Sequence, residues 1–259
     1  MSTPPVNPLP LSVLLLARDE SARLAALLPR LAFARQVLVV LDTATRDDSR
    51  EIALRSGAEV IERPLTDFGE QRQFGLEHCR EPWVLWLDAD ERLDGVAERE
   101  LRRVIESEGA AAGYRIERRT WFLGKRIDHC GWRGERILRL FRRDRARFEP
   151  AVVHERVTVD GRIEDLPGTM EHHSYADWRA CRDKLVRYAG LGAEKARRAG
   201  KRSGPLDVVL RPPLRFVRMY VLQAGFLDGA HGAALCALAS AQVLLKYLEL
   251  WADPARARE

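Results

Sequence analysis

The chain has 259 residues, of which 46% are hydrophobic and 31% are charged. These values are typical of a globular protein and exclude a disordered, collagen-like or disulfide-rich chain. Its four cysteines lie about fifty residues apart with no CxxC pair, which argues against a zinc knuckle or a disulfide framework and favours a reducing compartment.

The formal net charge of +5 is unevenly distributed along the chain. Residues 1–114 contain 14 basic and 20 acidic residues, whereas residues 179–218 contain 12 basic and 3 acidic residues. This asymmetry predicts that the later part of the chain contacts a polyanion or an anionic membrane surface.

Four short apolar runs in the first ninety residues have the pattern of strands buried on both faces. They cover residues 11–17, 36–41, 58–62 and 83–87. The first run has no preceding Lys or Arg and no cleavage site after it, so it is interpreted as a strand rather than a signal peptide.

Helical patterns lie between these runs. Apolar residues recur with helical spacing at residues 24–31, a capping cluster of Asp47, Asp48 and Ser49 opens a second helix, and Phe74 lies in a third. Strands alternating with helices predict an α/β fold with a mostly parallel sheet, whose ligands gather at the carboxyl ends of the strands.

Acidic residues follow three of the four predicted strands. They are Asp19 and Glu20 after the first, Asp42 after the second, and Asp88, Asp90 and Glu91 after the fourth. Each of them alone is explained equally well as a helix cap, but capping needs only one such residue per helix. Together they indicate a polar crevice at one edge of the sheet.

No Gly-rich phosphate loop follows any of the predicted strands, which removes the main support for a Rossmann dehydrogenase or a P-loop protein. In the segment WVLWLDADE, Asp88 and Asp90 bracket one small residue at the end of a buried strand. Two such carboxylates can share one hard cation, Mg²⁺ or Mn²⁺, of the kind that binds a diphosphate and neutralises it as it leaves.

With these motifs the sequence resembles glycosyltransferase family 2, which has the GT-A fold. The resemblance rests on LSVLLLARDE, VLVVLDTATRDDSREIA, GAEVIERPLTDFGEQRQFGLE and WVLWLDADERL, and it continues through FLGKRIDHCGW, RLFRRDRARFEPAVVHERV, HHSY and GFLDGAHG. It is closest to the branch of β-1,4-glucosyltransferases that act on the lipopolysaccharide inner core.

The resemblance implies roles for individual residues. Asp42 corresponds to an aspartate that contacts the base or ribose of a nucleotide sugar, Asp88 and Asp90 to the DxD pair with Asp90 nearest the metal, and Arg72 to a residue facing the nucleotide. Asp19, before Glu20, stands where the family usually has Asn, so it keeps an acceptor oxygen but lacks the amide donor. The implied donor is UDP-glucose and the implied acceptor is a lipopolysaccharide core sugar.

An inverting transfer needs a base that removes the proton of the acceptor hydroxyl. Glu135 and Glu155 are the candidates, with Glu135 preferred because Trp132 nearby offers an aromatic face for a sugar ring, although either is equally well a salt-bridged surface carboxylate. His154, and also the pair His172 and His173, could supply a third metal ligand or a hydrogen bond to the diphosphate, and are otherwise packed histidines. Strand alternation separates Arg139 from Leu140, so Arg139 can reach the diphosphate.

The C-terminal part, residues 176–259, is expected to be a helical extension of a catalytic domain at residues 1–175. That domain is expected to have a nucleotide-sugar half at 1–110 and an acceptor half at 111–175. Residues 229–245 have no Asp, Glu, Lys or Arg but are too few to span a membrane, and arginines precede them. We expect the extension to associate with an anionic membrane surface, or alternatively to pack on the catalytic domain or on a second copy in a homo-oligomer.

The sequence therefore predicts a metal-dependent hexosyltransferase that is cytoplasmic and peripheral on the cytoplasmic face of the inner membrane. Two alternatives have other functions. One is a non-catalytic module that binds nucleic acid or another polyanion, and the other is a membrane scaffold derived from a transferase. The first lacks the basic and aromatic strand pattern of such modules, so no nucleic-acid partner is expected.

Overall fold

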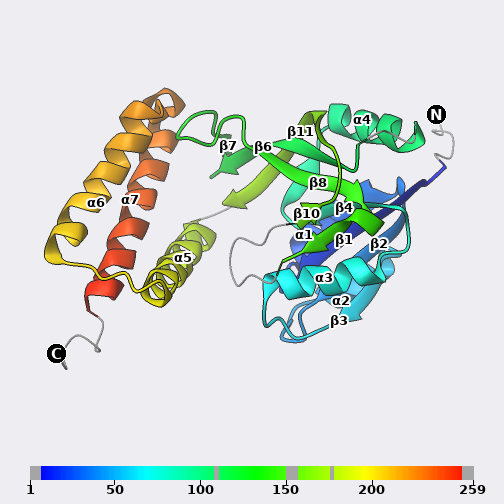
Figure 1. The fold of residues 1–259 in the computed structure, drawn as a ribbon, viewed down its shortest axis with the longest axis horizontal. Helices are drawn as coiled ribbons and strands as arrows, with labels where there is room; N and C mark the ends of the chain where they lie inside the picture. Colours follow the sequence, from blue (N-terminus) through cyan, green and yellow to red (C-terminus); the bar gives the residue numbers. More distant parts are fainter. Residues whose placement is uncertain (1–6, 108–110, 150–156, 176–177, 253–259) are drawn as a thin grey trace. The chain divides into compact units, whose positions relative to one another are not determined.

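The structure is a computed structural model that describes residues 7–107, 111–149, 157–175 and 178–252 (Figure 1). The chain divides into two compact units, the first formed by residues 1–118 and 135–172 and the second by residues 119–134 and 173–259. The predicted domain boundary at residue 175 stays a prediction.

The first unit is built on a sheet with helices on both faces. Its elements are β1 (Leu9–Ala17), α1 (Ser21–Leu27), η1 (Leu28–Leu31), β2 (Ala34–Leu41), α2 (Ser49–Arg55), β3 (Glu59–Glu62), α3 (Phe68–His78), β4 (Trp83–Asp88), β5 (Glu91–Leu93), α4 (Gly95–Glu106), β6 (Gly113–Phe122), β8 (Arg136–Arg142), η2 (Arg143–Arg145), β9 (Ala146–Phe148), β10 (Val157–Val159) and β11 (Ile163–Tyr175). The last residues of β6 and β11 belong to the second unit.

In the described residues the main sheet has nine strands in the order β3-β2-β1-β4-β8-β6-β11-β5, with β7 (Lys125–Arg126) paired to β6. The pairs β3/β2, β2/β1 and β1/β4 are parallel, and the pairs β4/β8, β8/β6 and β11/β5 are antiparallel. The four strands predicted from the apolar runs are confirmed, and they form the parallel half of the sheet.

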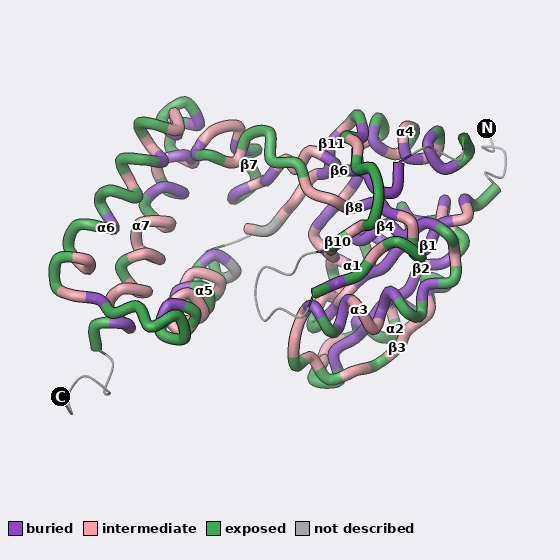
Figure 2. The backbone as a smooth tube through the Cα atoms, in the orientation of Figure 1, coloured by how far each residue is buried: buried purple, intermediate pink, exposed green. Residues whose placement is uncertain are grey.

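Alternate side chains of β1 enter two hydrophobic cores, as the period of two in a strand requires. Val13 and Leu15 pack with residues of α1, α2 and α4, whereas Leu14 packs with α3 and with Phe148 of β9. Buried residues accordingly concentrate in the inner strands of this unit (Figure 2). The continuous apolar runs of the sequence therefore reflect a sheet covered on both faces.

The cluster predicted to cap α2 connects two helices. Asp48 is the N-cap residue of α2, but its side chain accepts no capping hydrogen bond. The carboxylate of Asp47 instead accepts from the backbone N–H of Ser49, at 3.0 Å, and of Ser21 at the start of α1, at 2.9 Å. This carboxylate thus ties the loop after β1 to the loop after β2.

A bulge interrupts the regular pairing of β8. Tyr114 of β6 lies opposite Leu140 and Arg115 lies opposite Leu138, so Arg139 is the extra residue on β8. The pairing of β4 with β8 ends at Leu85 and Leu140, so it stops at the residue next to Arg139. A bulge re-aims the side chain of the extra residue, and here it is the side chain of Arg139.

The second unit is mainly helical. It contains β7, α5 (Trp178–Arg198), α6 (Pro205–Val217), η3 (Arg218–Leu222), η4 (Gly225–Asp228) and α7 (Gly229–Trp251), and α7 packs against both α5 and α6. Its largest buried cluster joins the end of β6 and the segment after it to α5, η3 and α7. The buried residues are Phe122, Ile127, Cys130, Cys181, Met219, Leu235 and Cys236. The expectation that the chain after residue 175 is mainly helical is confirmed over its described residues.

Within the described residues, one helical stretch, Gly225–Trp251, has the length and composition to cross a membrane, a test that the core helix of a soluble protein also passes. The sequence analysis considered only residues 229–245, which contain no Asp, Glu, Lys or Arg and are too few to span a membrane. The helix itself is longer, because it continues past Lys246 and Glu249 to Trp251.

The motif GFLDGAHG forms the junction between η4 and α7. The buried carboxylate of Asp228 accepts from the backbone N–H groups of Asp128, at 3.2 Å, and His129, at 2.9 Å, which fixes the loop after β7. A Cβ on Gly232 would lie 2.0 Å from the carbonyl oxygen of Gly225. The glycine is therefore required by backbone packing.

Replacing Gly232 with alanine is expected to destabilise the protein by at least about 2 kcal/mol, because the clash is with backbone that cannot rotate away. Thermal denaturation of the purified variant measures the loss. Gly190→Ala in α5 is the matched control, since its Cβ would lie 3.5 Å from the nearest atom, the carboxylate oxygen of Glu249. An equal melting temperature of the two variants would contradict the packing argument.

Candidate functional site

The acidic strand ends predicted to lie together do so in the first unit. β1 lies between β2 and β4, with Ala17 paired to Leu41 and Leu16 paired to Asp88. The three neighbouring parallel strands therefore end at one edge of the sheet, and the residues that follow them share that edge. The carboxyl edge of such a sheet is where ligands bind in open α/β folds.

The side chains after β1 and β2 are held mainly by loop backbone and by nearby arginines. Asp42 is buried, and its Oδ1 accepts from the N–H groups of Ala44 and Leu65 at 3.1 and 3.3 Å, while its Oδ2 accepts from Arg18 at 3.2 Å. Asp42 thereby connects the segments that follow β1, β2 and β3, which shapes the edge of the sheet.

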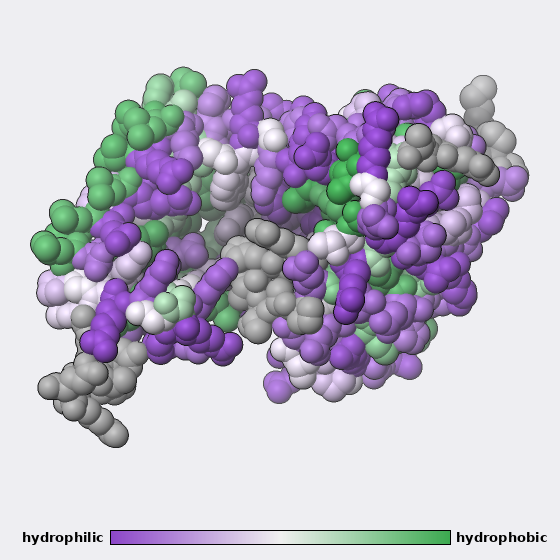
Figure 3. All heavy atoms as spheres, viewed as in Figure 1, coloured by the Kyte–Doolittle hydropathy of each residue, from purple (hydrophilic) through white to green (hydrophobic). Residues whose placement is uncertain are grey.

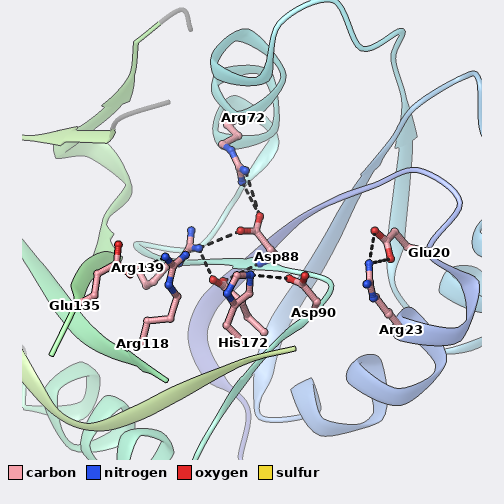
Figure 4. Close-up of polar contacts among 10 residues, drawn as sticks. Glu20, Arg23, Arg72, Asp88, Asp90, Arg118, Glu135, Arg139 and His172 are labelled. Atoms are coloured by element: carbon pink, nitrogen blue, oxygen red, sulfur yellow. Dashed lines mark hydrogen bonds and ion pairs between the residues drawn. The ribbon is translucent and has the colours of Figure 1, made fainter. Parts of the chain in front are cut away.

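Asp19 and Glu20 both have local partners. Asp19 has a left-handed backbone, with φ of 52°, and its Oδ1 accepts from the N–H of Arg46 at 2.7 Å. Glu20 pairs with Arg23 on α1 at 2.8 Å, and Figure 4 shows this pair separate from the contacts around Asp88. Their roles at the nucleotide, implied by the family resemblance, stay predictions.

Asp88 lies between two arginines from different elements (Figure 4). Arg72 of α3 approaches its Oδ1 at 3.2 Å, and Arg139, the extra residue of the β8 bulge, approaches its Oδ2 at 3.0 Å. The guanidinium carbon of each arginine lies 4.1 Å from the ring centre of Trp86, two residues before Asp88 on β4. Trp86 is thus a platform that orients both cations by cation–π contact.

Glu91 completes this cluster from β5. Its side chain is fully buried, its Oε1 accepts from Arg139 at 2.6 Å, and its Oε2 accepts from the N–H of Asp88 at 3.1 Å. Burial raises the pKa of Glu91, the positive charge of Arg139 opposes that rise, and the negative charge of Asp88 adds to it. Burial alone would also raise the pKa of Asp88, but Arg72 and Arg139 outweigh it and hold that pKa well below its usual range.

Asp90 has a different partner. Its Oδ1 lies 3.6 Å from Nε2 of His172 on β11, the strand in which His172 is paired with Glu91 of β5. Both side chains are largely buried. A carboxylate oxygen and an imidazole nitrogen that face each other are a donor set that suits Mn²⁺ and, through the carboxylate, Mg²⁺.

Across residues 7–107, 111–149, 157–175 and 178–252, no three His, Cys, Asp or Glu side chains are grouped for a metal ion. The chemistry of the cluster still fits a cation. The charges of Arg72 and Arg139 are offset by Asp88, Asp90 and the carboxyl of Glu91, so the cluster has no excess of positive charge. A diphosphate is therefore attracted only weakly unless a cation adds positive charge. Asp90 and His172 provide the ligand types that would hold such a cation.

Glu135 lies in the loop before β8 and pairs with Arg118 of β6. The distance from Arg118 Nη2 to Glu135 Oε2 is 2.6 Å, and the glutamate side chain is 44% exposed. Glu135 was preferred in the sequence because the ring of Trp132 could contact a sugar. One face of that ring is covered, because it stacks on Tyr175 with centroids 6.0 Å apart. The assignment of Glu135 as the base stays a prediction.

Two predicted residues, His154 and Glu155, lie outside the described residues. Of the other two histidines considered in the sequence, His173 stacks on Trp121 with centroids 5.4 Å apart, and His172 is the one beside Asp90.

The roles of Trp86 and Glu91 were missed in the sequence. The alternation along β4 that places Trp86 and Asp88 on one face could have identified the aromatic platform. The position of Glu91 in DADE offered no signal that it would turn inward to Arg139, because that contact depends on the bulge in β8.

Comparison with known proteins agrees with this architecture. The sequence profile of glycosyl transferase family 2 matches residues 12–157, which include the carboxyl ends of β1, β2 and β4. The mannosyltransferase PcManGT of Pyrobaculum calidifontis, solved with GDP-Man and Mn²⁺, superposes with a TM-score of 0.50 at 14% identity, over 98% of this chain and 79% of that one. This similarity shows the shared fold.

Two curated relatives extend along most of the chain. The lipopolysaccharide core biosynthesis glycosyltransferase LpsC of Rhizobium meliloti (strain 1021) is 26% identical over 253 residues, which is 92% of this chain and 93% of LpsC. The uncharacterized glycosyltransferase RP128 of Rickettsia prowazekii (strain Madrid E) is 23% identical over 233 residues, 86% of this chain and 80% of that protein. The resemblance seen in the sequence is confirmed: the chain is a glycosyltransferase that belongs to family 2 and has the GT-A fold.

Proposed function

We propose that this glycosyltransferase moves a hexose, glucose from UDP-glucose, onto an inner-core sugar of lipopolysaccharide with inversion at the anomeric carbon. The observation that carries the proposal is the cluster at the end of β4, where Asp88 pairs with two arginines held by Trp86 and Asp90 faces His172. The acceptor class is supported by the relative LpsC, whose name assigns it to lipopolysaccharide core biosynthesis.

The donor lies across the carboxyl ends of β1, β2 and β4 in this proposal. Asp42 contacts the base or ribose, with Asp19 and Glu20 at the neighbouring strand end. Arg72 and Arg139 exchange part of their contact with Asp88 for the oxygens of the diphosphate, to which guanidinium groups donate in pairs. Trp86 keeps both guanidinium groups in place during this exchange, which lowers the cost of reorganisation.

The proposal includes a divalent cation, Mg²⁺ or Mn²⁺, which supplies the positive charge that stabilises a departing diphosphate. Asp88 and Asp90 would hold it together with a histidine. His154 was predicted for this place from the sequence, and His172 is the histidine that lies 3.6 Å from Asp90. The ion pair between Asp88 and the two arginines keeps that carboxylate ionised, as a ligand must be.

A transfer assay tests the function directly. Purified enzyme is incubated with radiolabelled UDP-glucose, UDP-galactose or GDP-mannose, with Mn²⁺ or Mg²⁺, and with lipopolysaccharide truncated in the inner core. We expect label to enter the lipopolysaccharide from UDP-glucose with a divalent cation present. If no nucleotide sugar labels any truncated acceptor, the proposed reaction is refuted.

In the inverting step Glu135 removes the proton of the acceptor hydroxyl as that oxygen attacks the anomeric carbon, and Arg118 positions the carboxylate. Replacing Glu135 with glutamine is expected to reduce transfer by about a hundredfold or more, because an amide cannot accept the proton. Hydrolysis and binding of the donor should remain. Glu117→Gln, a partly exposed glutamate of β6 that pairs with Arg136, is the matched control. Normal transfer by the Glu135 variant would exclude it as the base and leave Glu155 as the candidate.

We further propose that the enzyme works in the cytoplasm, peripheral on the cytoplasmic face of the inner membrane, where its acceptor is embedded. Fractionation of the cell tests this location, since the enzyme should sediment with inner membranes and be released by salt. Recovery in the soluble fraction at low ionic strength would contradict it.

A further inference from the structure

Helix α6 turns an apolar face to solvent. Among the large hydrophobic side chains of the described residues, the most exposed include Leu222 at 77%, Leu206 at 73% and Leu214 at 65%. They belong to a continuous series that we call the apolar ridge: Leu206, Val209, Leu210, Leu214, Val217, Val221, Leu222, Phe226 and Leu227. Hydrophobic atoms gather along α6, at the left of the view in Figure 3.

The opposite side of α6 is attached to α7, so the ridge cannot turn inward without breaking that packing. Pro212 is buried, and its carbonyl oxygen accepts from Ser240 Oγ of α7 at 2.8 Å. Met219, after the end of α6, is buried in the same cluster as Leu235 of α7. A soluble helix normally buries its apolar stripe, whereas α6 has one side on α7 and a second apolar side exposed.

Arginines border the ridge along one side. At 3.6 residues per turn, Arg211, Arg215 and Arg218 fall between the ridge and the side that packs on α7. All three are exposed, and Arg211 also pairs with Asp207 and lies over the ring of Tyr247. Residues 178–252, which hold all the described helices of this unit, contain 13 Lys and Arg against 5 Asp and Glu.

We propose that the apolar ridge is a membrane-binding surface that lies in the interface of a bilayer containing anionic lipids, with α6 parallel to the membrane plane. Apolar side chains on one side and cations along their border match the acyl region and the headgroups. Among the described residues, Gly225–Trp251 is the one stretch long and apolar enough to cross a bilayer, and α6 with η3 does not meet that test. The exposed Arg211, Arg215 and Arg218 keep α6 and η3 at the headgroups, so the ridge enters one leaflet only.

Charge decides between a bilayer and a second copy of the chain. Two copies docked through their ridges would bring the same arginines together in an excess of positive charge, which opposes association. An anionic bilayer covers the apolar side chains and attracts the arginines at the same time. The inference deepens the proposed location at the membrane but does not depend on the proposed transfer reaction, since it concerns α6, η3 and η4 and uses no residue of the donor site.

Sedimentation with vesicles tests the ridge in the full-length protein. We expect the protein to bind phosphatidylcholine vesicles that contain 30% phosphatidylglycerol. Binding to phosphatidylcholine alone should be about tenfold weaker, because the arginines are attracted to anionic headgroups. High salt should also weaken binding, because it screens that attraction. The double variant Leu214→Ser and Leu222→Ser should bind anionic vesicles at least about tenfold more weakly. Leu54→Ser on α2, also an exposed leucine on a helix, should bind like the wild type. Equal binding by the double variant and the wild type would overturn the proposal.

Site-specific labelling locates the contact. The four native cysteines are buried, so a cysteine introduced at Leu214 or Leu54 can be labelled with an environment-sensitive dye. Anionic vesicles should shift the emission of the dye at 214 to the blue and leave the dye at 54 unchanged. The dye at 214 could instead shift when the protein concentration is raised without vesicles, while analytical ultracentrifugation shows a dimer. That result would assign the ridge to contact with a second copy and refute the proposed membrane-binding surface.

The same double variant separates this inference from the proposed function. Its transfer to a water-soluble, deacylated acceptor should equal that of the wild type, while transfer to an acceptor in vesicles should fall with the loss of binding. Failure of all transfer by the wild type would refute the proposed function and leave the vesicle result valid.

Discussion

Replacing Arg139 with methionine is expected to lower the free energy of unfolding by about 3–5 kcal/mol, because it leaves the buried carboxylate of Glu91 without its cationic partner. The melting temperature should fall by about 10 °C. Methionine fills a similar volume and keeps contact with Trp86, so the loss reports mainly the charge. Arg162→Met, which removes an exposed pair with Glu164, is the control and should change stability by less than about 1 kcal/mol.

The loss should also depend on pH. Glu91 has a pKa above its usual value of 4.5 because it is buried, and removal of Arg139 removes the charge that opposes this rise. A carboxyl with a raised pKa in the folded state is favoured in its protonated form. The Arg139→Met variant should therefore be most stable below about pH 4.5, relative to the wild type, and lose stability as the pH rises through the higher folded pKa.

Adding Glu91→Gln to Arg139→Met should recover most of the stability and abolish this pH dependence. The glutamine oxygen can still accept from the N–H of Asp88, and no buried charge remains. A double variant as unstable as Arg139→Met would show that packing or the β8 bulge, rather than the ion pair, determines the loss.

Replacing Asp90 with alanine is expected to reduce sugar transfer by about a hundredfold or more, which corresponds to the several kcal/mol of charge stabilisation that a metal ligand contributes. The melting temperature should change little, since Asp90 contacts His172 at 3.6 Å and lies outside the ion pairs of Glu91. Initial rates at saturating donor and Mn²⁺ measure the effect.

Asp144→Ala, an exposed aspartate of η2 in the same unit, is the matched control for Asp90 and should transfer at the normal rate. His172→Ala separates the metal role from a general structural role. If His172 shares the cation with Asp90, its loss should raise the Mn²⁺ concentration needed for half-maximal transfer. Undiminished transfer by Asp90→Ala would remove Asp90 from the reaction.

The parallel half of the fold could be predicted from the sequence because its strands are buried on both faces and leave uninterrupted apolar runs. The end of each run marked the residues at the site edge, which is why Asp42, Asp88 and Asp90 were identified without a structure. The lack of a Gly-rich loop removed the main support for a Rossmann dehydrogenase or a P-loop protein, which agrees with the match to family 2.

The contacts around Asp88 could not be predicted in the same way. They depend on Arg139, whose direction is set by a one-residue bulge in an antiparallel strand, and a bulge leaves no periodic signal. Glu91 and His172 meet through the pairing of β5 with β11, about eighty residues apart in sequence. The apolar ridge could not be predicted either. The arginines before residue 229 indicated contact with a membrane, but the sequence did not show which side of the helix faces outward.

The central claim is that Asp88 and Asp90 bind a nucleotide sugar together with a divalent cation. Thermal denaturation with UDP-glucose, with and without Mn²⁺, tests it most directly in the wild type and in Asp90→Asn. At a donor concentration of 100 times Kd, the account predicts stabilisation of about 2.7 kcal/mol in the wild type with Mn²⁺ present, and none without Mn²⁺ or in the variant. Equal stabilisation of both proteins by UDP-glucose without a metal would contradict it.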